Sequence, residues 1–190
     1  MEPVTLGVAL CGSFCTYERV FAALKDLKAR YPNLIPILSE SAATVDSRFG
    51  TAEEHRAALT RICGTAPRTT LREVEPIGPK KQLDLLLIAP CTGNTLAKLA
   101  AGIADGPVTL AAKSHLRNER PLLLAVSTND GLGVNARSIG TLLAQKHVFF
   151  VPFGQDDPLG KPRSLVADFS RLPDAVDAAL AGRQLQPILI

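Results

Sequence analysis

The sequence predicts an α/β protein built on a three-layer, doubly wound parallel sheet. Two observations support this fold: short, mostly unbroken apolar runs recur along the chain, and amphipathic helical segments separate them. Apolar runs without polar alternation suit strands that are buried on both faces, and strands that alternate with helices are typical of parallel sheets. The expected strands span residues 4–10, 34–38, 83–89, 121–126 and 148–152. The expected helices span residues 17–29, 52–62, 95–101, 135–145 and 173–181.

Two stretches interrupt this alternation. Residues 64–81 contain Pro67, Pro76 and Pro79, so we expect a long connection there that leaves room for one short strand. Residues 153–163 are rich in glycine, aspartate and proline, which is typical of a turn-rich loop. Neither stretch has the composition of a linker between domains. Because 190 residues are enough to build one hydrophobic core, we expect a single domain over residues 1–190.

Composition and charge exclude several classes of function. The net charge of +3, with Lys and Arg scattered among acids, gives no uniform basic face for nucleic acid. The apolar runs fall short of the roughly 18 residues that a membrane-spanning helix needs, and the N-terminus lacks the basic region of a signal peptide. The cysteines form no C-x-x-C pair, so we expect no metal site. These features favour a cytoplasmic protein that binds a small anionic ligand.

Small polar residues follow the first four expected strands. In an open parallel sheet, ligands bind outside the carboxyl ends of the strands, and hydroxyl groups together with free helix N–H groups suit a phosphate. Capping of the next helix explains any one of these positions equally well. The expected cofactor-binding residues are Gly12, Ser13, Ser39, Ser41, Pro90, Thr92, Gly93, Asn94, Thr95, Ser127, Thr128 and Asn129.

The turn after the first strand, residues 11–16, indicates which nucleotide fits. It contains one glycine, Gly12, followed by Ser13. It has neither the G-x-G-x-x-G spacing of a dinucleotide fold nor the G-x-x-x-x-G-K-[ST] spacing of a P-loop. One glycine allows a phosphate to approach the backbone closely at one position, which is sufficient for a monophosphate. We therefore expect FMN rather than NAD.

These turns resemble a known superfamily. The Gly12-Ser13 turn, the Ser39-x-Ser41 turn and the run over residues 89–95 are similar to the FMN-facing turns of FMN-dependent cysteine decarboxylases and flavin prenyltransferases. The resemblance implies a Rossmann-like flavoprotein fold. Longer segments resemble one branch of this superfamily, the dipicolinate synthase B chains. They span residues 46–50, 88–94, 117–121, 127–130 and 153–158.

The branch resemblance implies an oxidoreductase subunit of sporulating bacteria. In that branch, the B chain works with an A chain to oxidise a dihydrodipicolinate-type intermediate to dipicolinate. The resemblance also implies that the A chain carries NAD(P), since this chain has no dinucleotide motif. It further implies a homo-oligomer in the cytoplasm of the mother cell.

A dicarboxylate substrate needs cationic or N–H donors, and the planar guanidinium of arginine binds a carboxylate with two hydrogen bonds. The candidates are Arg48, Lys113, Arg117 and Arg120, and Arg48 is preferred because it lies in the loop after the second strand. A solvated surface position is the commoner account of each, since an arginine or lysine in a loop is usually solvated. The expected substrate-binding residues are Arg48, Arg117 and Asp130, and the sequence identifies no catalytic residue.

Two other functions remain open. One is a flavin-dependent decarboxylase or flavin prenyltransferase of the same fold. The P-x-M-N segment typical of the decarboxylases is replaced here by Ser-Thr-Asn-Asp at residues 127–130, and Met1 is the only methionine. The other is a non-catalytic nucleotide-binding partner of the A chain. His55 lies in a charged run and is expected to be a solvated surface histidine, whereas Cys91 is expected to be a buried packing residue.

Overall fold

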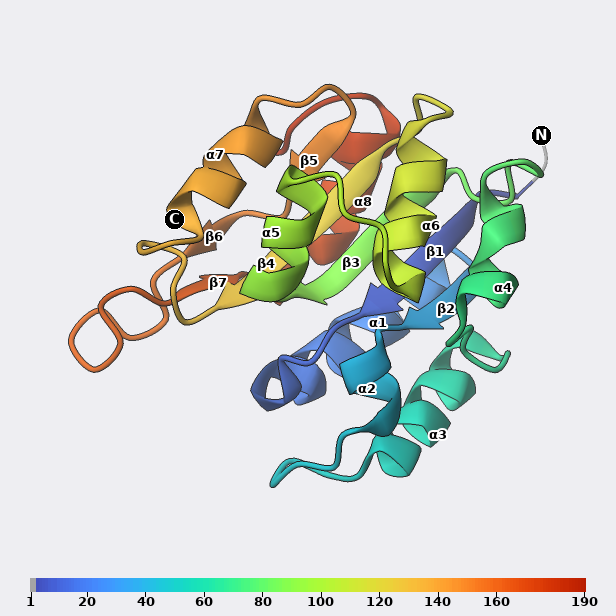
Figure 1. The fold of residues 1–190 in the computed structure, drawn as a ribbon, viewed down its shortest axis with the longest axis horizontal. Helices are drawn as coiled ribbons and strands as arrows, with labels where there is room; N and C mark the ends of the chain where they lie inside the picture. Colours follow the sequence, from blue (N-terminus) through green and yellow to red (C-terminus); the bar gives the residue numbers. More distant parts are fainter. Residues whose placement is uncertain (1–2) are drawn as a thin grey trace.

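The computed structural model describes residues 3–190, and its centre is one continuous sheet (Figure 1). The strand order is β2-β1-β3-β4-β7-β6, and β5 pairs with β4 beside this path. The strands are β1 (Thr5–Leu10), β2 (Asn33–Leu38), β3 (Leu85–Cys91), β4 (Leu122–Thr128), β5 (Val148–Phe150), β6 (Phe153–Gly154) and β7 (Leu165–Ala167).

The first five strands are parallel, as the sequence predicts. Their order, β2-β1-β3-β4-β5, reverses direction between β1 and β3, which is the switch point of a doubly wound sheet. The short strands β6 and β7 were not expected. β7 runs antiparallel to the carboxyl end of β4, where Ser127 pairs with Val166 and Thr128 with Leu165. The returning chain therefore closes over the end of β4.

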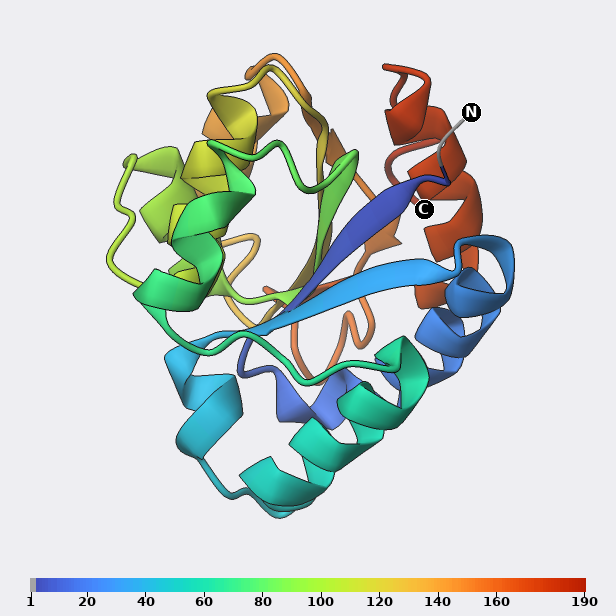
Figure 2. The same ribbon diagram turned by 90° about the vertical axis from the view of Figure 1, so that its right-hand side faces the viewer.

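Helices cover both faces of the sheet, which confirms the three-layer architecture. Figure 2 shows the blue α1 and the red α8 on one side, and the green to orange α5, α6 and α7 on the other. Within residues 3–190, no helix is long and apolar enough to cross a membrane. The helices are α1 (Tyr17–Arg30), α2 (Glu40–Thr44), α3 (Ala52–Cys63), α4 (Leu71–Val74), α5 (Gly93–Ala100), α6 (Pro107–Leu116), α7 (Ala136–Leu143) and α8 (Leu172–Leu180).

Helix α6 and the short helices α2 and α4 were missing from the sequence-based prediction. α6 begins with Pro107 in its first turn, where the missing proline N–H costs nothing because it would have no helical partner. When it is considered alone, the same proline indicates the interruption of a helix rather than its start. Between α3 and α4, the expected short strand is reduced to one bridge between Arg68 and Ile37.

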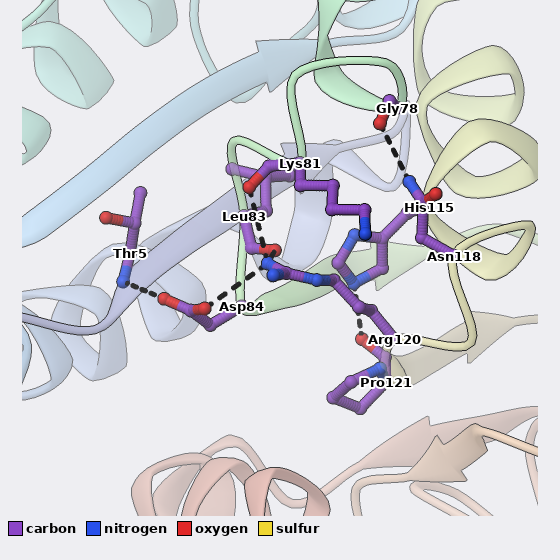
Figure 3. A network of polar contacts seen from close by, with 9 residues as sticks. All are labelled: Thr5, Gly78, Lys81, Leu83, Asp84, His115, Asn118, Arg120 and Pro121. Atoms are coloured by element: carbon purple, nitrogen blue, oxygen red, sulfur yellow. Dashed lines mark hydrogen bonds and ion pairs between the residues drawn. The ribbon is translucent and has the colours of Figure 1, made fainter. Parts of the chain in front are cut away.

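A polar network ties together the amino ends of β1, β3 and β4 (Figure 3). The Arg120 guanidinium donates to the carbonyl oxygens of Leu83 and Lys81 and forms an ion pair of 3.3 Å with Asp84. The other carboxylate oxygen of Asp84 accepts the backbone N–H of Thr5 at 2.8 Å. One arginine and one aspartate therefore satisfy the polar groups that these strands leave unpaired at this edge of the sheet.

His115 on α6 joins the same edge as a buried neutral group. Its Nε2 lies 3.0 Å from the carbonyl oxygen of Pro121, and burial lowers the pKa of the imidazole from 6.5 to about 4. The folded pKa lies below the unfolded value, so the neutral ring contributes stability above pH 6.5 that is lost as the pH falls toward 4.

We expect His115→Gln to flatten this pH dependence. Because each pKa unit corresponds to about 1.4 kcal/mol, the wild type should lose roughly 3 kcal/mol more than the variant between pH 6.5 and 4. Urea unfolding at a series of pH values measures the difference. His147→Gln, at an exposed histidine, is the matched control and should keep the wild-type slope. Identical slopes for the wild type and His115→Gln would contradict the assignment.

Candidate functional site

A cavity of about 1080 Å³ opens at the carboxyl ends of β1, β3 and β4. It lies at the switch point of the sheet, where doubly wound proteins bind their ligands. The structure brings most of the predicted cofactor residues and two of the predicted substrate residues to its wall. Those lining the cavity are Gly12, Ser13, Thr92, Gly93, Asn94, Ser127, Thr128, Asn129, Arg48 and Asp130.

Four predicted cofactor residues do not line the cavity. Ser39 caps α2, its Oγ accepting the N–H of Ala42 at 3.2 Å. Pro90 is buried inside β3, and the Thr95 hydroxyl donates to the buried sulfur of Cys11 at 3.2 Å. Ser41 is exposed beside the first turn, where its Cβ would be 3.3 Å from a Cβ added to Gly12. Capping or packing accounts for Ser39, Pro90 and Thr95.

Arg117 lies away from the cavity. It follows the last residue of α6, and its Nη2 would be 3.3 Å from a Cβ added to Gly78. Gly78 accepts a hydrogen bond from Asn118 in the network at the amino ends of the strands (Figure 3). The structure therefore does not bring Arg117 to the other substrate candidates, because the helix before it runs back along the sheet to the opposite edge.

Hydroxyl and N–H donors form the floor of the cavity. The Ser13 and Ser127 hydroxyls lie 2.7 Å apart and connect the first turn to the end of β4. Thr92 caps α5, accepting the N–H of Thr95 at 3.3 Å. The first N–H groups of a helix have no partner within it, so the N-terminus of α5 presents donors and a partial positive charge at the cavity. This floor suits an anionic group.

A polar cluster of Thr128, Asp130 and Asn135 packs directly against Gly93. The two carboxylate oxygens of Asp130 accept from the Asn135 amide nitrogen, at 2.9 and 2.8 Å, and one of them also accepts a hydrogen bond from Thr128. A Cβ on Gly93 would lie 2.5 Å from the Asn135 nitrogen and 2.6 Å from the Thr128 hydroxyl. Only glycine allows this approach. Sequence reasoning missed Asn135 because it considered the residue only as the start of a helix.

Cationic side chains line the remaining wall. Arg19, Lys161 and Arg163 join Arg48 there, and the carboxylates that face them are Asp130 and Asp156. Four cations against two carboxylates leave an excess of positive charge in the cavity, which favours an anionic ligand. Sequence reasoning missed Arg19, Lys161 and Arg163 because a helix face and a turn-rich loop are ordinary places for solvated cations.

His55 is buried, contrary to the expected surface position. Its side chain is 7% exposed, and its ring lies 4.7 Å from that of Tyr17 and 6.1 Å from that of Phe14. Desolvation lowers the pKa of the imidazole. The charged neighbours in the sequence point outward from α3 while His55 faces inward, so local charge was a poor guide to burial.

The cysteines divide by exposure. Cys11, Cys63 and Cys91 are buried, as expected for Cys91, and burial raises the pKa of Cys11 and of Cys63 to about 11. Such thiols are unreactive at neutral pH. Cys15 is exposed and lines the cavity. It is therefore an accessible thiol at the site itself.

Comparison with known proteins agrees with this fold. Residues 1–158 match the family described as Flavoprotein. The chain belongs to the flavoprotein family. It is 42% identical over 185 residues to the B subunit of dipicolinate synthase from Bacillus subtilis (strain 168), covering 97% of this chain and 92% of that protein. This confirms the resemblance inferred from the turns.

Two solved structures resemble this chain to different degrees. The crystal structure of the dipicolinate synthase B subunit from Bacillus halodurans C is 40% identical, with a TM-score of 0.90 over 98% of this flavoprotein and 96% of that chain. The FMN-dependent cysteine decarboxylase SpaF is 23% identical, with a TM-score of 0.68 over 93% of this chain and 97% of the other. The second likeness establishes the shared fold alone.

We expect Gly93→Ala to destabilise the ligand-free flavoprotein by about 1–3 kcal/mol, because the new methyl group must displace the polar cluster. Gly140→Ala is the matched control. A Cβ at Gly140 meets nothing within 4 Å, and alanine in the interior of α7 should add up to about 1 kcal/mol. Urea unfolding of both variants measures the effect, and equal changes in stability would rule out crowding at Gly93.

Proposed function

We propose that this flavoprotein is the flavin-binding B subunit of a dipicolinate synthase, contributing to the oxidation of a dihydrodipicolinate-type dicarboxylate to dipicolinate. The observation that carries the proposal is the division of one cavity into a floor of hydroxyl and N–H donors and a wall of cations. Its volume of about 1080 Å³ is at the upper end of ordinary ligand pockets. It leaves room for a cofactor and a small substrate together.

The residues of the floor fit the phosphate and polyol of FMN. Gly12 gives a backbone approach without a side chain, and Ser13 and Ser127 supply hydroxyl donors beside it. Thr92, Gly93 and Asn94 bring the N-terminus of α5 to the same place. Ser39, Pro90 and Thr95 support these turns from behind, and Ser41 is exposed beside Gly12. A bound flavin supplies an acceptor for two electrons, and the protein determines what is held against it.

The cationic wall fits a substrate with two carboxylates. The Arg48 guanidinium lies 4.8 Å from the centre of the Phe49 ring at the cavity, which limits the orientations of both side chains. Arg19, Lys161 and Arg163 supply the remaining charge. Arginine binds a carboxylate with paired hydrogen bonds, so Arg48 and Arg163 are the proposed carboxylate ligands.

The proposal includes an A chain that carries NAD(P). The relative in Bacillus subtilis is a B subunit by name, which implies a partner, and the turn at residues 11–16 lacks dinucleotide spacing. The loop after β6 offers an apolar tip for contact, since Leu159 is 97% exposed. We further propose a single domain over residues 1–190, a homo-oligomer, and a cytoplasmic role in the mother cell during sporulation.

Decarboxylation of a peptidyl cysteine is the rival function of the same fold, suggested by the likeness to SpaF. The strand end that carries P-x-M-N in those enzymes here presents Thr128 and Asp130 to the cavity. Asn129 stands in the place of the methionine and the Asp130 carboxylate in the place of the asparagine, and a negative charge there disfavours the carboxyl terminus of a peptide. Carbon dioxide release from a cysteine-terminated peptide would reverse this preference.

We expect FMN to protect Cys15 from alkylation. The thiol lines the proposed site, so saturating FMN should slow its reaction with iodoacetamide by at least about tenfold, as measured by mass spectrometry of the labelled peptides. Gly12→Asp should abolish the protection by placing a negative charge beside the phosphate. Cys15→Ser should take up almost no label, because the other cysteines are buried. Equal labelling of the wild type with and without FMN would show that FMN does not bind in this cavity.

We expect the chain alone, supplied with NAD(P), to convert dihydrodipicolinate at less than about one hundredth of the rate of a mixture with the A chain. The physical reason is that the first turn cannot receive a dinucleotide pyrophosphate. Ultraviolet absorbance of dipicolinate follows the reaction of each chain separately and of the mixture. Full activity from this chain alone would show that the two-chain assignment is wrong.

A further inference from the structure

We infer that Asp130 is the proton acceptor of the reaction, an inference that rests on the proposed function. Aromatisation of a dihydrodicarboxylate breaks two C–H bonds at neighbouring ring carbons. One hydrogen leaves as hydride, taking both electrons to a flavin or nicotinamide oxidant. The other leaves as a proton, and its electron pair becomes the new ring double bond. A base at the cavity must take that proton.

The side chains that line the cavity leave few choices for this base. No histidine is among them, within the residues that the structure describes. Arginine and lysine are protonated at neutral pH, and thiols are mostly so, whereas carboxylates are ionised. The carboxylates at the cavity are Asp130 and Asp156. Asp156 lies 3.6 Å from the ammonium of Lys161, in the loop after β6. Asp130 has no ion-pair partner within 4 Å among residues 3–190.

Asp130 is also held more firmly than Asp156. Its carboxylate accepts from the Asn135 amide and the Thr128 hydroxyl, and its backbone carbonyl accepts the N–H of Gly133 at 2.8 Å. Thr128 is the last residue of β4, so the carboxylate is fixed to the rigid sheet. A catalytic base needs such fixed geometry because proton transfer requires hydrogen-bond reach.

Asn135 is a positioning residue in this account. Its Nδ2 lies within hydrogen-bond distance of both carboxylate oxygens of Asp130, so flipping the amide would replace this donor with an oxygen that the carboxylate repels. Its Oδ1 is buried and has no partner. A buried acceptor without a donor costs free energy, and native proteins keep few of them. We infer that this cost is tolerated because the hydrogen bonds from Nδ2 orient the Asp130 carboxylate.

Binding of the product tests the inference without any oxidant. Dipicolinate is a dianion, and a carboxylate beside it is favoured in its protonated form. The other charged groups at the cavity are Arg19, Arg48, Lys161, Arg163 and Asp156, and the cations attract the product. If Asp130 faces the ring, the wild-type protein should take up measurably more protons for each dipicolinate bound than Asp130→Asn does at about pH 6.

Isothermal titration of dipicolinate into the FMN-loaded protein, in buffers of different ionisation enthalpy, measures this uptake. Asp130→Asn should bind dipicolinate at least as tightly as the wild type and take up almost no proton. Asp156→Asn, the other carboxylate at the cavity, should keep the wild-type uptake. In the two-chain assay, Asp130→Asn should lower kcat by about 10²–10⁴ with little change in KM.

The outcomes separate the two levels of the proposal. Failure of the wild type to bind dipicolinate would overturn the proposed substrate and this inference with it. Binding with no proton uptake, or uptake that persists in Asp130→Asn, would overturn the inference and leave the proposed function standing. If Asp130→Asn does not fold, Thr128→Val should move the uptake to higher pH by removing a donor to the carboxylate, and Thr128→Ser should restore it. No shift in Thr128→Val would count against Asp130.

Discussion

Every residue of β3 and β4 is buried, because helices cover the central sheet on both faces. Between these covers the strands can carry only apolar side chains or polar groups that pair internally. Polar chemistry is therefore restricted to the two edges of the sheet where the strands begin and end. The position of the cavity follows from this restriction, since the chain leaves β1, β3 and β4 at one edge and must turn there.

The two edges of the sheet use their polar groups differently. At the amino ends, Arg120 and Asp84 bond to backbone groups of neighbouring segments, and His115 bonds to Pro121 (Figure 3). The polar and charged side chains at this edge pair with one another or with the backbone, which suits a structural role. At the carboxyl ends, the donors of α5 and the cations of the wall face open space. Unsatisfied groups at that edge are available to a ligand.

The sequence was informative where one physical rule decides the outcome. Buried parallel strands need continuous apolar runs, so the sequence located all five parallel strands. The residues that follow these strands included Ser13, Thr92 and Asp130, which line the cavity. It was uninformative where the outcome depends on distant contacts. Proline at the start of α6 has the same sequence signature as a break. The direction of His55 and the place of Arg117 depend on how helices pack, which no local pattern contains.

The contact at Gly93 shows why a site residue can escape sequence reasoning while its neighbours do not. Gly93 was predicted from its place after β3, and Thr128 from its place at the end of β4. Their meeting depends on the parallel register that sets Cys91 beside Val126. Once the two turns are side by side, the space left by the missing Cβ is filled by the amide of Asn135, which then holds Asp130. A glycine predicted from its place after β3 thus also sets the geometry of a carboxylate in the turn after β4, and that coupling exists only in three dimensions.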